Sequence, residues 1–136
     1  MKKKILLLAD DTETQLFVHR VLTEQGHQVD VADDLEAAQQ LSRRTLYDLV
    51  VVDTCSTHFS SGEVSYRLRH NNPAGRPSVL VLGQLMMRQT QDLWFKIGAD
   101  GCLCKPFSDR GLLLSVETVL RPSSKGLMEK IYREFA

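Results

Sequence analysis

Five short apolar runs recur along this chain, and the segments between them are long enough to form helices. The runs are Ile5–Ala9, Val29–Ala32, Leu49–Val52, Val79–Leu82 and Gly101–Cys104. Strand-length apolar runs that alternate with helix-length segments predict a parallel sheet with helices on both faces. The unbroken hydrophobicity of the third and fourth runs indicates strands that are covered on both sides. We therefore expect an α/β protein with a doubly wound, five-stranded parallel sheet.

The segments between the apolar runs carry helix signals. The first helix is expected to follow Asp11, with Thr12 as its cap. The others are expected at residues 34–44, from about residue 62 to the turn-rich NNPAGRP, at 87–97, and at 108–120. Residues 1–121 are therefore predicted to form one domain. The tail, residues 122–136, is predicted to be a linker and a short amphipathic helix with one apolar side: Leu127, Ile131 and Phe135.

The composition bounds what such a chain can do. Its 136 residues are 43% hydrophobic and 25% charged, which suits one soluble domain with a single core. The formal net charge of zero gives no electrostatic drive toward nucleic acid or an anionic membrane. The first apolar run is short and ends on aspartates, which argues against export and membrane insertion. Three cysteines without CxxC spacing argue against a disulfide framework, so we expect a cytoplasmic protein.

Carboxylates follow two of the expected strands. Asp10 and Asp11 come after the first apolar run, and Asp53 comes after the third. Because ligands of an open parallel sheet bind beyond the carboxyl ends of its strands, these side chains meet in one pocket if the two strands are neighbours. Mg²⁺ takes carboxylate and water oxygens and would offset the repulsion between like charges. The plainer interpretation of the acidic pair is a helix cap with a first-turn charge.

A lysine follows the fifth apolar run. Lys105 and the next residue, Pro106, are predicted at the same rim of the sheet as the carboxylates. A lysine ammonium beside a carboxylate and Mg²⁺ suits a phosphoryl group, because both cations neutralise its oxygens. The nucleophile would then be an aspartate that forms an acyl phosphate. A Lys-Pro pair alone predicts only a turn. The argument for a phosphoryl site therefore depends on the order of the three motifs: DD after the first strand, D after the third and KP after the fifth.

This combination resembles the receiver domain of two-component response regulators over about residues 3–121. The motifs that carry the resemblance are LLADD at 7–11, DLVVVDT at 48–54, GADG at 98–101 and KPF at 105–107. The resemblance implies a flavodoxin-like sheet with strand order 2-1-3-4-5. It also implies that Asp53 accepts a phosphoryl group from a histidine kinase or a small phosphodonor.

The same resemblance implies the ligands of a magnesium ion. Asp11 and Asp53 would bind Mg²⁺ directly, Asp10 would bind it through water, and the backbone carbonyl of Cys55 would complete the protein ligands. The peptide bond between Lys105 and Pro106 would be cis.

Two positions depart from the family pattern. Receivers normally place Thr or Ser at the end of the fourth strand, where its hydroxyl bonds the phosphoryl group, and this chain has Gly83 there. They also place an aromatic residue in the fifth strand, and this chain has Cys102. The metal-binding and acceptor residues are thus present, whereas the hydroxyl and aromatic residues that normally form the switch are missing. Phosphorylation is therefore expected to be only weakly coupled to a change of shape.

The resemblance implies a signalling module that transfers phosphoryl only onto its own Asp53 and is not otherwise an enzyme. Its partners would be a sensor histidine kinase or phosphotransfer protein, and a downstream protein or fused effector domain. A homodimer would form through the fourth helix, fifth strand and fifth helix, and this domain would bind neither nucleic acid nor membrane. One alternative is a pseudo-receiver, which binds proteins independently of phosphorylation. A weaker alternative is a haloacid-dehalogenase-like phosphatase, which usually needs DxD where this chain has DD followed by Thr12.

Overall fold

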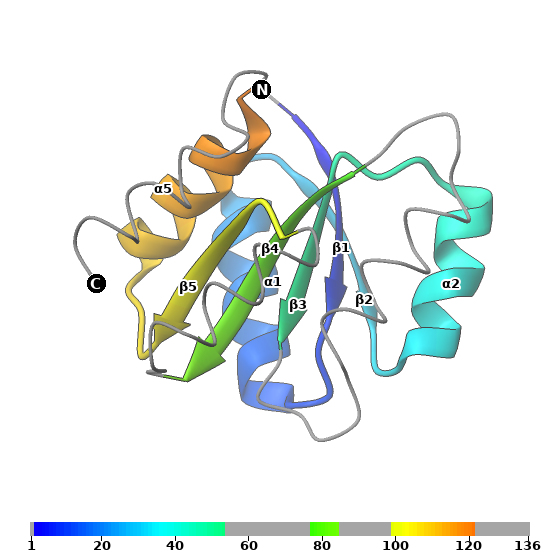
Figure 1. Cartoon of the computed structure of the whole chain (residues 1–136), viewed down its shortest axis with the longest axis horizontal. Helices are drawn as coiled ribbons and strands as arrows, with labels where there is room; N and C mark the ends of the chain where they lie inside the picture. Colours follow the sequence, from blue (N-terminus) through cyan, green and yellow to red (C-terminus); the bar gives the residue numbers. More distant parts are fainter. Residues whose placement is uncertain (1, 54–76, 85–98, 122–136) are drawn as a thin grey trace.

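Five parallel strands form a single sheet in the computed structural model of this chain, which describes residues 2–53, 77–84 and 99–121. The strands are β1 (Lys4–Leu8), β2 (Gln28–Ala32), β3 (Leu49–Asp53), β4 (Ser78–Gln84) and β5 (Gly101–Lys105). Their order across the sheet is β2-β1-β3-β4-β5, and every neighbouring pair is parallel (Figure 1). The predicted fold class and strand order are confirmed.

Three helices lie within the described residues: α1 (Thr12–Glu24), α2 (Leu35–Arg44) and α5 (Asp109–Leu120). Each begins close to its predicted start, and Ser108 is the N-cap residue of α5. The helices predicted from about residue 62 and at 87–97, and the predicted tail helix, lie outside the described residues. In the described part of the chain, no helix is both long and apolar enough to span a membrane.

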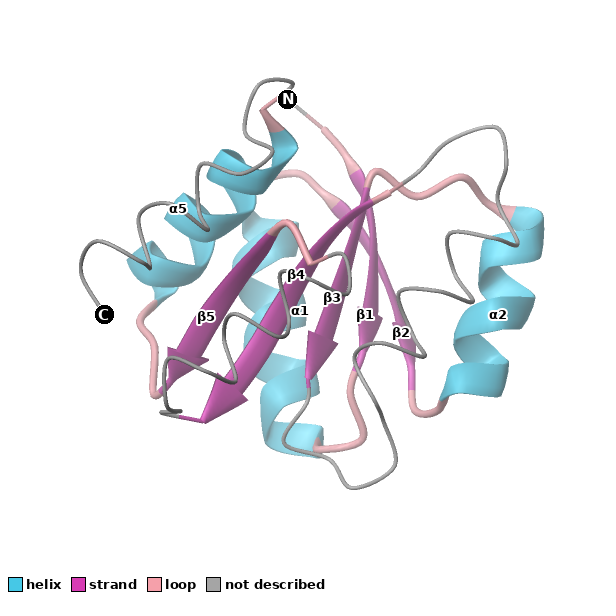
Figure 2. Ribbon diagram, viewed as in Figure 1, coloured by secondary structure: helices cyan, strands magenta, loops and turns pink. Residues whose placement is uncertain are grey.

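The sheet is covered on both faces, as the unbroken apolar runs predict (Figure 2). On one face, α1 and α5 pack against alternate residues of the strands, such as Leu7, Val51 and Leu82. On the other face, α2 packs against the residues between them, such as Leu8 and Val52. Since side chains alternate along a strand, each face takes every second residue of β1, β3 and β4. Asp53 therefore belongs to the face that carries α1 and α5.

The cap of α1 differs from the prediction. Asp11, not Thr12, is the N-cap residue, and its side chain accepts a hydrogen bond from the backbone N–H of Thr14. A carboxylate at this position satisfies an N–H that has no partner within the helix, and its charge suits the helix dipole. The plainer interpretation of the acidic pair is therefore correct for Asp11 as a description of its local structure.

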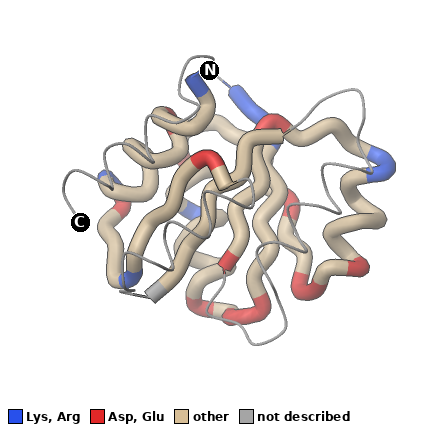
Figure 3. The backbone as a smooth tube through the Cα atoms, in the orientation of Figure 1, with Lys and Arg blue, Asp and Glu red and all other residues tan. Residues whose placement is uncertain are grey.

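The strand register brings the predicted site residues to one rim. Leu8 pairs with Val52 and Gln84 pairs with Lys105, so β1 and β3 end side by side and β4 and β5 end together. Figure 3 shows acidic segments along the lower edge of the molecule, towards which the strand arrows of Figure 1 point. Asp53 and Lys105 are the last residues of their strands, where a side chain can still be held by the sheet.

Candidate functional site

The centre of the candidate site is an ion pair between Asp53 and Lys105. The Asp53 side chain is only 1% exposed, and its Oδ2 lies 2.9 Å from Lys105 Nζ. The Lys105 side chain is 24% exposed, so the pair has a buried anion and a cation that reaches the surface. A buried carboxylate without a counter-charge would be strongly unfavourable, and Lys105 supplies that charge from two strands away. The predicted approach of these two residues is thus found in the structure.

Thr14 joins this pair to Asp11. Its hydroxyl oxygen accepts a hydrogen bond from Lys105 Nζ at 3.0 Å and donates one to Asp11 Oδ2 at 2.8 Å. The described structure therefore contains a continuous path of contacts from Asp53 through Lys105 and Thr14 to Asp11. We did not predict Thr14 as a site residue. The signal that could have found it is a hydroxyl residue three positions after a capping aspartate, which places its hydroxyl beside that carboxylate.

The hydrogen bonds of Thr14 also affect the charge state of Asp11. The side-chain hydrogen bond from Thr14 is the main cause that lowers the pKa of Asp11 below its usual value of 3.8. Desolvation is the next largest effect and opposes it, whereas the backbone N–H donors of Thr14 and Glu13 and the charge of Lys105 also lower the pKa. Asp11 is therefore held as an anion at the rim of the sheet at neutral pH.

Asp10 is exposed beside Asp11, at the point where the chain leaves β1. The segment before it is fastened by Gln15, whose side-chain Nε2 donates to the backbone oxygen of Ala9 at 2.6 Å and to Asp33 Oδ1 at 2.6 Å. These bonds tie the β1–α1 connection to the loop after β2. They hold the acidic pair at a set place on the rim.

The donor chemistry fits a magnesium ion, because carboxylates at the ends of adjacent strands supply the oxygen ligands that Mg²⁺ prefers alongside water. Within residues 2–53, 77–84 and 99–121, no three His, Cys, Asp or Glu side chains lie together as a group that could hold a metal ion. Cys55, predicted to contribute a backbone carbonyl, lies outside the described residues. A metal ion would thus rest on few protein ligands and several waters, as is usual for Mg²⁺.

The two residues predicted to replace the family's switch residues, Gly83 and Cys102, lie in β4 and β5 as predicted. Gly83 is buried in β4, opposite Cys104 of β5. Cys102 is fully buried in the cluster on the α2 face, with neighbours that include Val79 and Val81. The peptide bond between Lys105 and Pro106 is cis, the form that the resemblance implies.

An open pocket lies beside Lys105 and Asp11. Its lining combines the polar site residues with an apolar wall made by Phe17 of α1 and Phe107 after β5. These two rings meet edge to face, with their centroids 5.7 Å apart. Lys105 and Asp11 therefore face this pocket beside an aromatic wall.

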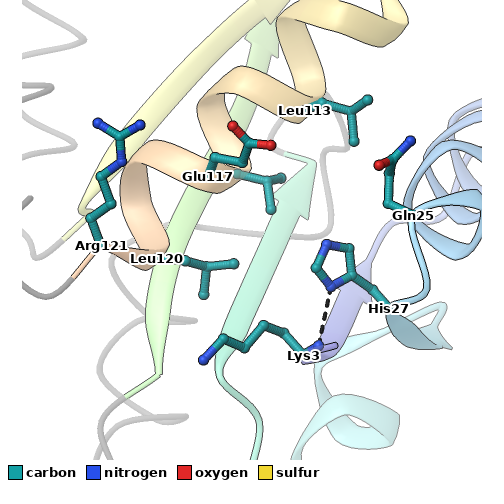
Figure 4. A pocket seen from close by; sticks show the side chains of 8 residues that line it. Lys3, Gln25, His27, Leu113, Glu117, Leu120 and Arg121 are labelled. Carbon is teal, nitrogen blue, oxygen red and sulfur yellow. Dashed lines mark hydrogen bonds between the residues drawn. The ribbon is translucent and has the colours of Figure 1, made fainter. Parts of the chain in front are cut away.

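A second pocket lies at the other end of the sheet. Leu113, Glu117 and Leu120 of α5 line one side, and Lys3 and His27 are on the other (Figure 4). His27 Nδ1 accepts a hydrogen bond from the backbone N–H of Lys3 at 3.1 Å. Among the described residues, this pocket holds none of the predicted site residues.

Comparison with known proteins identifies the family. A family model described as the response regulator receiver domain matches residues 5–117. The chain is 33% identical over 126 residues to the probable transcriptional regulatory protein SilR of Salmonella typhimurium. The aligned residues make up 93% of this chain and 54% of SilR. This chain therefore belongs to the response regulator receiver domain family. It spans about half the length of the curated relatives it matches.

Solved structures agree on the fold. The chemotaxis protein CheY4 of Vibrio cholerae superposes with a TM-score of 0.78 at 21% identity, covering 88% of this chain and 99% of CheY4. A response regulator protein from Burkholderia pseudomallei superposes with a TM-score of 0.78 at 22% identity, covering 98% of this chain and 75% of that protein. The latter structure is described as having a phosphorylated aspartic acid, a calcium ion and citrate.

Proposed function

We propose that this receiver domain accepts a phosphoryl group on Asp53, with Mg²⁺, and signals by binding another protein. The observation that carries the proposal is the buried Asp53 carboxylate paired with Lys105 at the carboxyl ends of the strands. A nucleophile needs to be fixed and shielded, and an ammonium within hydrogen-bond distance can neutralise charge on an incoming phosphoryl oxygen. The aspartyl phosphate described for the Burkholderia pseudomallei regulator supports the same chemistry on this fold.

In the proposed reaction, an oxygen of Asp53 forms a bond to phosphorus while the bond from phosphorus to the donor breaks. The leaving group takes the electron pair of that bond. Lys105 then binds a phosphoryl oxygen in place of the carboxylate oxygen that it binds now. Asp11 and Asp53, with Asp10 through water and the carbonyl of Cys55, would hold Mg²⁺, which neutralises phosphoryl charge when bound. The domain acts on itself and does not turn over a separate substrate.

The partners follow from this chemistry. The phosphoryl donor would be a sensor histidine kinase, a phosphotransfer protein or a small phosphodonor. The output would be a downstream protein or an effector domain in the same polypeptide. Relatives named as transcriptional regulatory proteins, of which this chain covers 54% and 56%, support the second form. The domain itself, with its formal net charge of zero, would not bind DNA. Contact between two copies would use the surface that includes α5, where Leu114 is exposed. We place the protein in the cytoplasm, where such kinases present their phosphohistidine.

The test is the mass of the intact protein after incubation with Mg²⁺ and acetyl phosphate or phosphoramidate. We expect one added phosphoryl group on the wild type and none on Asp53→Asn. Asp109→Asn is the matched control, because Asp109 is an exposed aspartate of α5 and should leave labelling unchanged. Retention of the added mass by Asp53→Asn would assign the acceptor to another residue.

A second candidate, a phosphorylation-independent pseudo-receiver, is favoured by one observation. The two positions that normally report phosphorylation hold a glycine and a small buried cysteine, Gly83 and Cys102. Addition of beryllofluoride and Mg²⁺ separates the two candidates, since a phosphorylation-switched receiver changes conformation when they bind and a pseudo-receiver does not.

A further inference from the structure

The Thr14 hydroxyl is placed to do more than cap a helix. Thr14 lies in the first turn of α1 and is 8% exposed. Its hydroxyl contacts two charged groups at once: Lys105 at the end of β5, and Asp11, the N-cap of its own helix. A buried hydroxyl that served packing alone would not need two ionic partners.

The direction of these hydrogen bonds is set by chemistry. An ammonium group only donates, so the Thr14 oxygen must accept from Lys105. The single hydroxyl proton is then left for Asp11 Oδ2, which is an acceptor. The backbone N–H of Thr14 also donates to Asp11 Oδ2, at 3.3 Å. Thr14 therefore cannot rotate its hydroxyl without losing a bond to a charged partner.

Among the contacts of Lys105 are hydrogen bonds to Asp53 and Thr14, and these two anchors behave differently during phosphoryl transfer. A lysine side chain has high rotational entropy, so each anchor narrows the positions of its ammonium. The Asp53 anchor changes when the carboxylate becomes an acyl phosphate, because its negative charge moves to the phosphoryl oxygens. The Thr14 anchor takes no part in the covalent change. At the end of β4, Gly83 has no hydroxyl that could bind the phosphoryl group.

We propose that Thr14 is a positioning residue, which holds the Lys105 ammonium in place while phosphoryl is transferred to Asp53. This inference rests on the proposed function. With phosphoramidate as donor, an Asp53 oxygen bonds to phosphorus and the phosphorus–nitrogen bond breaks. The phosphoramidate nitrogen is already protonated (–NH₃⁺), so it takes the electron pair of the bond and departs as ammonia, and no proton passes through Thr14. Thr14 acts through Lys105 and does not touch the donor.

The test compares the rate of labelling by phosphoramidate and Mg²⁺ in three variants. Thr14→Val keeps the shape and removes the hydroxyl, and Thr14→Ser keeps the hydroxyl. Thr118→Val is the matched control, because Thr118 is also 8% exposed and its hydroxyl donates to a backbone oxygen of its own helix, far along α5 from the site. We expect Thr14→Val to be about tenfold slower, and the other two variants to stay within about twofold of wild type.

A second measurement separates positioning from a general structural role. In a Lys105→Met background, adding Thr14→Val should slow the residual labelling by less than about twofold, because the residue through which Thr14 acts is gone. Side-chain spectra of ¹⁵N-labelled lysine should show a shifted or broadened Lys105 ammonium signal in Thr14→Val, without phosphodonor, and an unchanged one in Thr118→Val. If Thr14→Val does not fold, Thr14→Ala is compared with Thr14→Ser in the same way.

The outcomes are distinguishable. A wild type that takes no label overturns the proposed function and the role in transfer, whereas the lysine spectra still decide whether Thr14 holds Lys105. A labelled wild type with an equally fast Thr14→Val overturns the inference alone. So does a Thr14→Ser as slow as Thr14→Val, or a full tenfold loss that persists in the Lys105→Met background.

Discussion

The two ends of the sheet both carry a pocket, but their charged groups are arranged differently. At the carboxyl end, a buried carboxylate, an ammonium, a hydroxyl and a second carboxylate form a continuous path: Asp53, Lys105, Thr14 and Asp11. At the amino end, Lys3, Glu117 and Arg121 stand around apolar side chains of α5 (Figure 4). The difference shows that a hollow is not by itself a site. What marks the carboxyl end is a charge that the fold has buried and then neutralised.

The difference has a simple origin. The amino end collects side chains of turns and of the last turns of α5, and its charged groups Glu117 and Arg121 are exposed to water. At the carboxyl end the strands stop side by side, and a residue at the last position of a strand is still enclosed by its neighbours. A charged residue there must find a counter-charge on another strand.

The largest expected effect is the loss of the Asp53–Lys105 pair. Lys105→Met should lower the free energy of unfolding by about 3 kcal/mol, because Asp53 is left buried without its cation. Adding Asp53→Asn to Lys105→Met should recover much of this loss. Urea unfolding of the two single variants and the double variant, without Mg²⁺, gives the coupling energy.

The control for that cycle is the Arg20–Asp109 pair between α1 and α5. Its atoms are 3.5 Å apart and both side chains are at least half exposed. Its coupling should be below about 1 kcal/mol. Equal coupling in the two pairs would remove the contrast between a buried ion pair and a surface ion pair.

The next effect concerns the missing hydroxyl at the carboxyl end. Gly83→Thr should shift the ratio of the two conformations in the beryllofluoride-bound protein by about one to two decades, since a hydrogen bond to a charged acceptor contributes about 1.5 to 3 kcal/mol. Amide NMR spectra with and without beryllofluoride and Mg²⁺ measure it. In the wild type we expect shifts confined to the surroundings of Asp11, Asp53 and Lys105.

The single variant should be measured before the double variant with Cys102→Tyr. Cys102 is fully buried, so a tyrosine there would overpack the core and cost about 1 to 3 kcal/mol of stability. Wide shifts along β5 in the wild type would show that another element carries the switch and that the assignment of Gly83 is incorrect.

A smaller effect should come from Mg²⁺ itself. At about ten times its dissociation constant, Mg²⁺ should stabilise the protein by about 1.4 kcal/mol and raise the thermal midpoint by roughly 4 to 6 °C. Asp11→Asn should reduce this rise, and NaCl of matched ionic strength should not produce it. A midpoint that Mg²⁺ leaves unchanged would count against a metal site at the carboxyl end.

The smallest effects separate the two ends by pH. At the amino end, burial lowers the pKa of His27 below its usual 6.5, helped by the charge of Lys3 and opposed by Glu117. At the carboxyl end, the pKa of Asp11 is below its usual 3.8. The unfolded chain therefore binds protons more readily than the folded protein at both groups, so each contribution to stability is lost as the pH falls.

The windows differ. The contribution of His27 is complete above pH 6.5 and declines from there down to its lowered pKa in the folded protein. The contribution of Asp11 is complete above pH 3.8 and declines only below that value. Urea midpoints measured from pH 7 to pH 3 should therefore lose the upper slope in His27→Gln and keep it in His19→Gln, since His19 is exposed on α1. An upper slope unchanged in His27→Gln would contradict this account.

The spacing of apolar runs was enough to predict the sheet, because strand and helix lengths are local properties of the chain. β1 begins and ends one residue earlier than predicted, and β3 extends one residue further than predicted. The identities of Asp11, Asp53 and Lys105 as rim residues also followed from sequence, since a charge directly after an apolar run must lie where a strand stops.

Only the tertiary structure decided which of these groups touch. The approach of Asp53 to Lys105 depends on the order β3-β4-β5, which the family resemblance implied, and on the register of three strands, which no local pattern encodes. The role of Asp11 as a cap, and the bridge that Thr14 makes from Asp11 to Lys105, depend on how α1 is set against the end of β5. The sequence determines which hydrogen bonds each side chain can donate or accept. The packing of segments distant in sequence determines which partner the side chain meets.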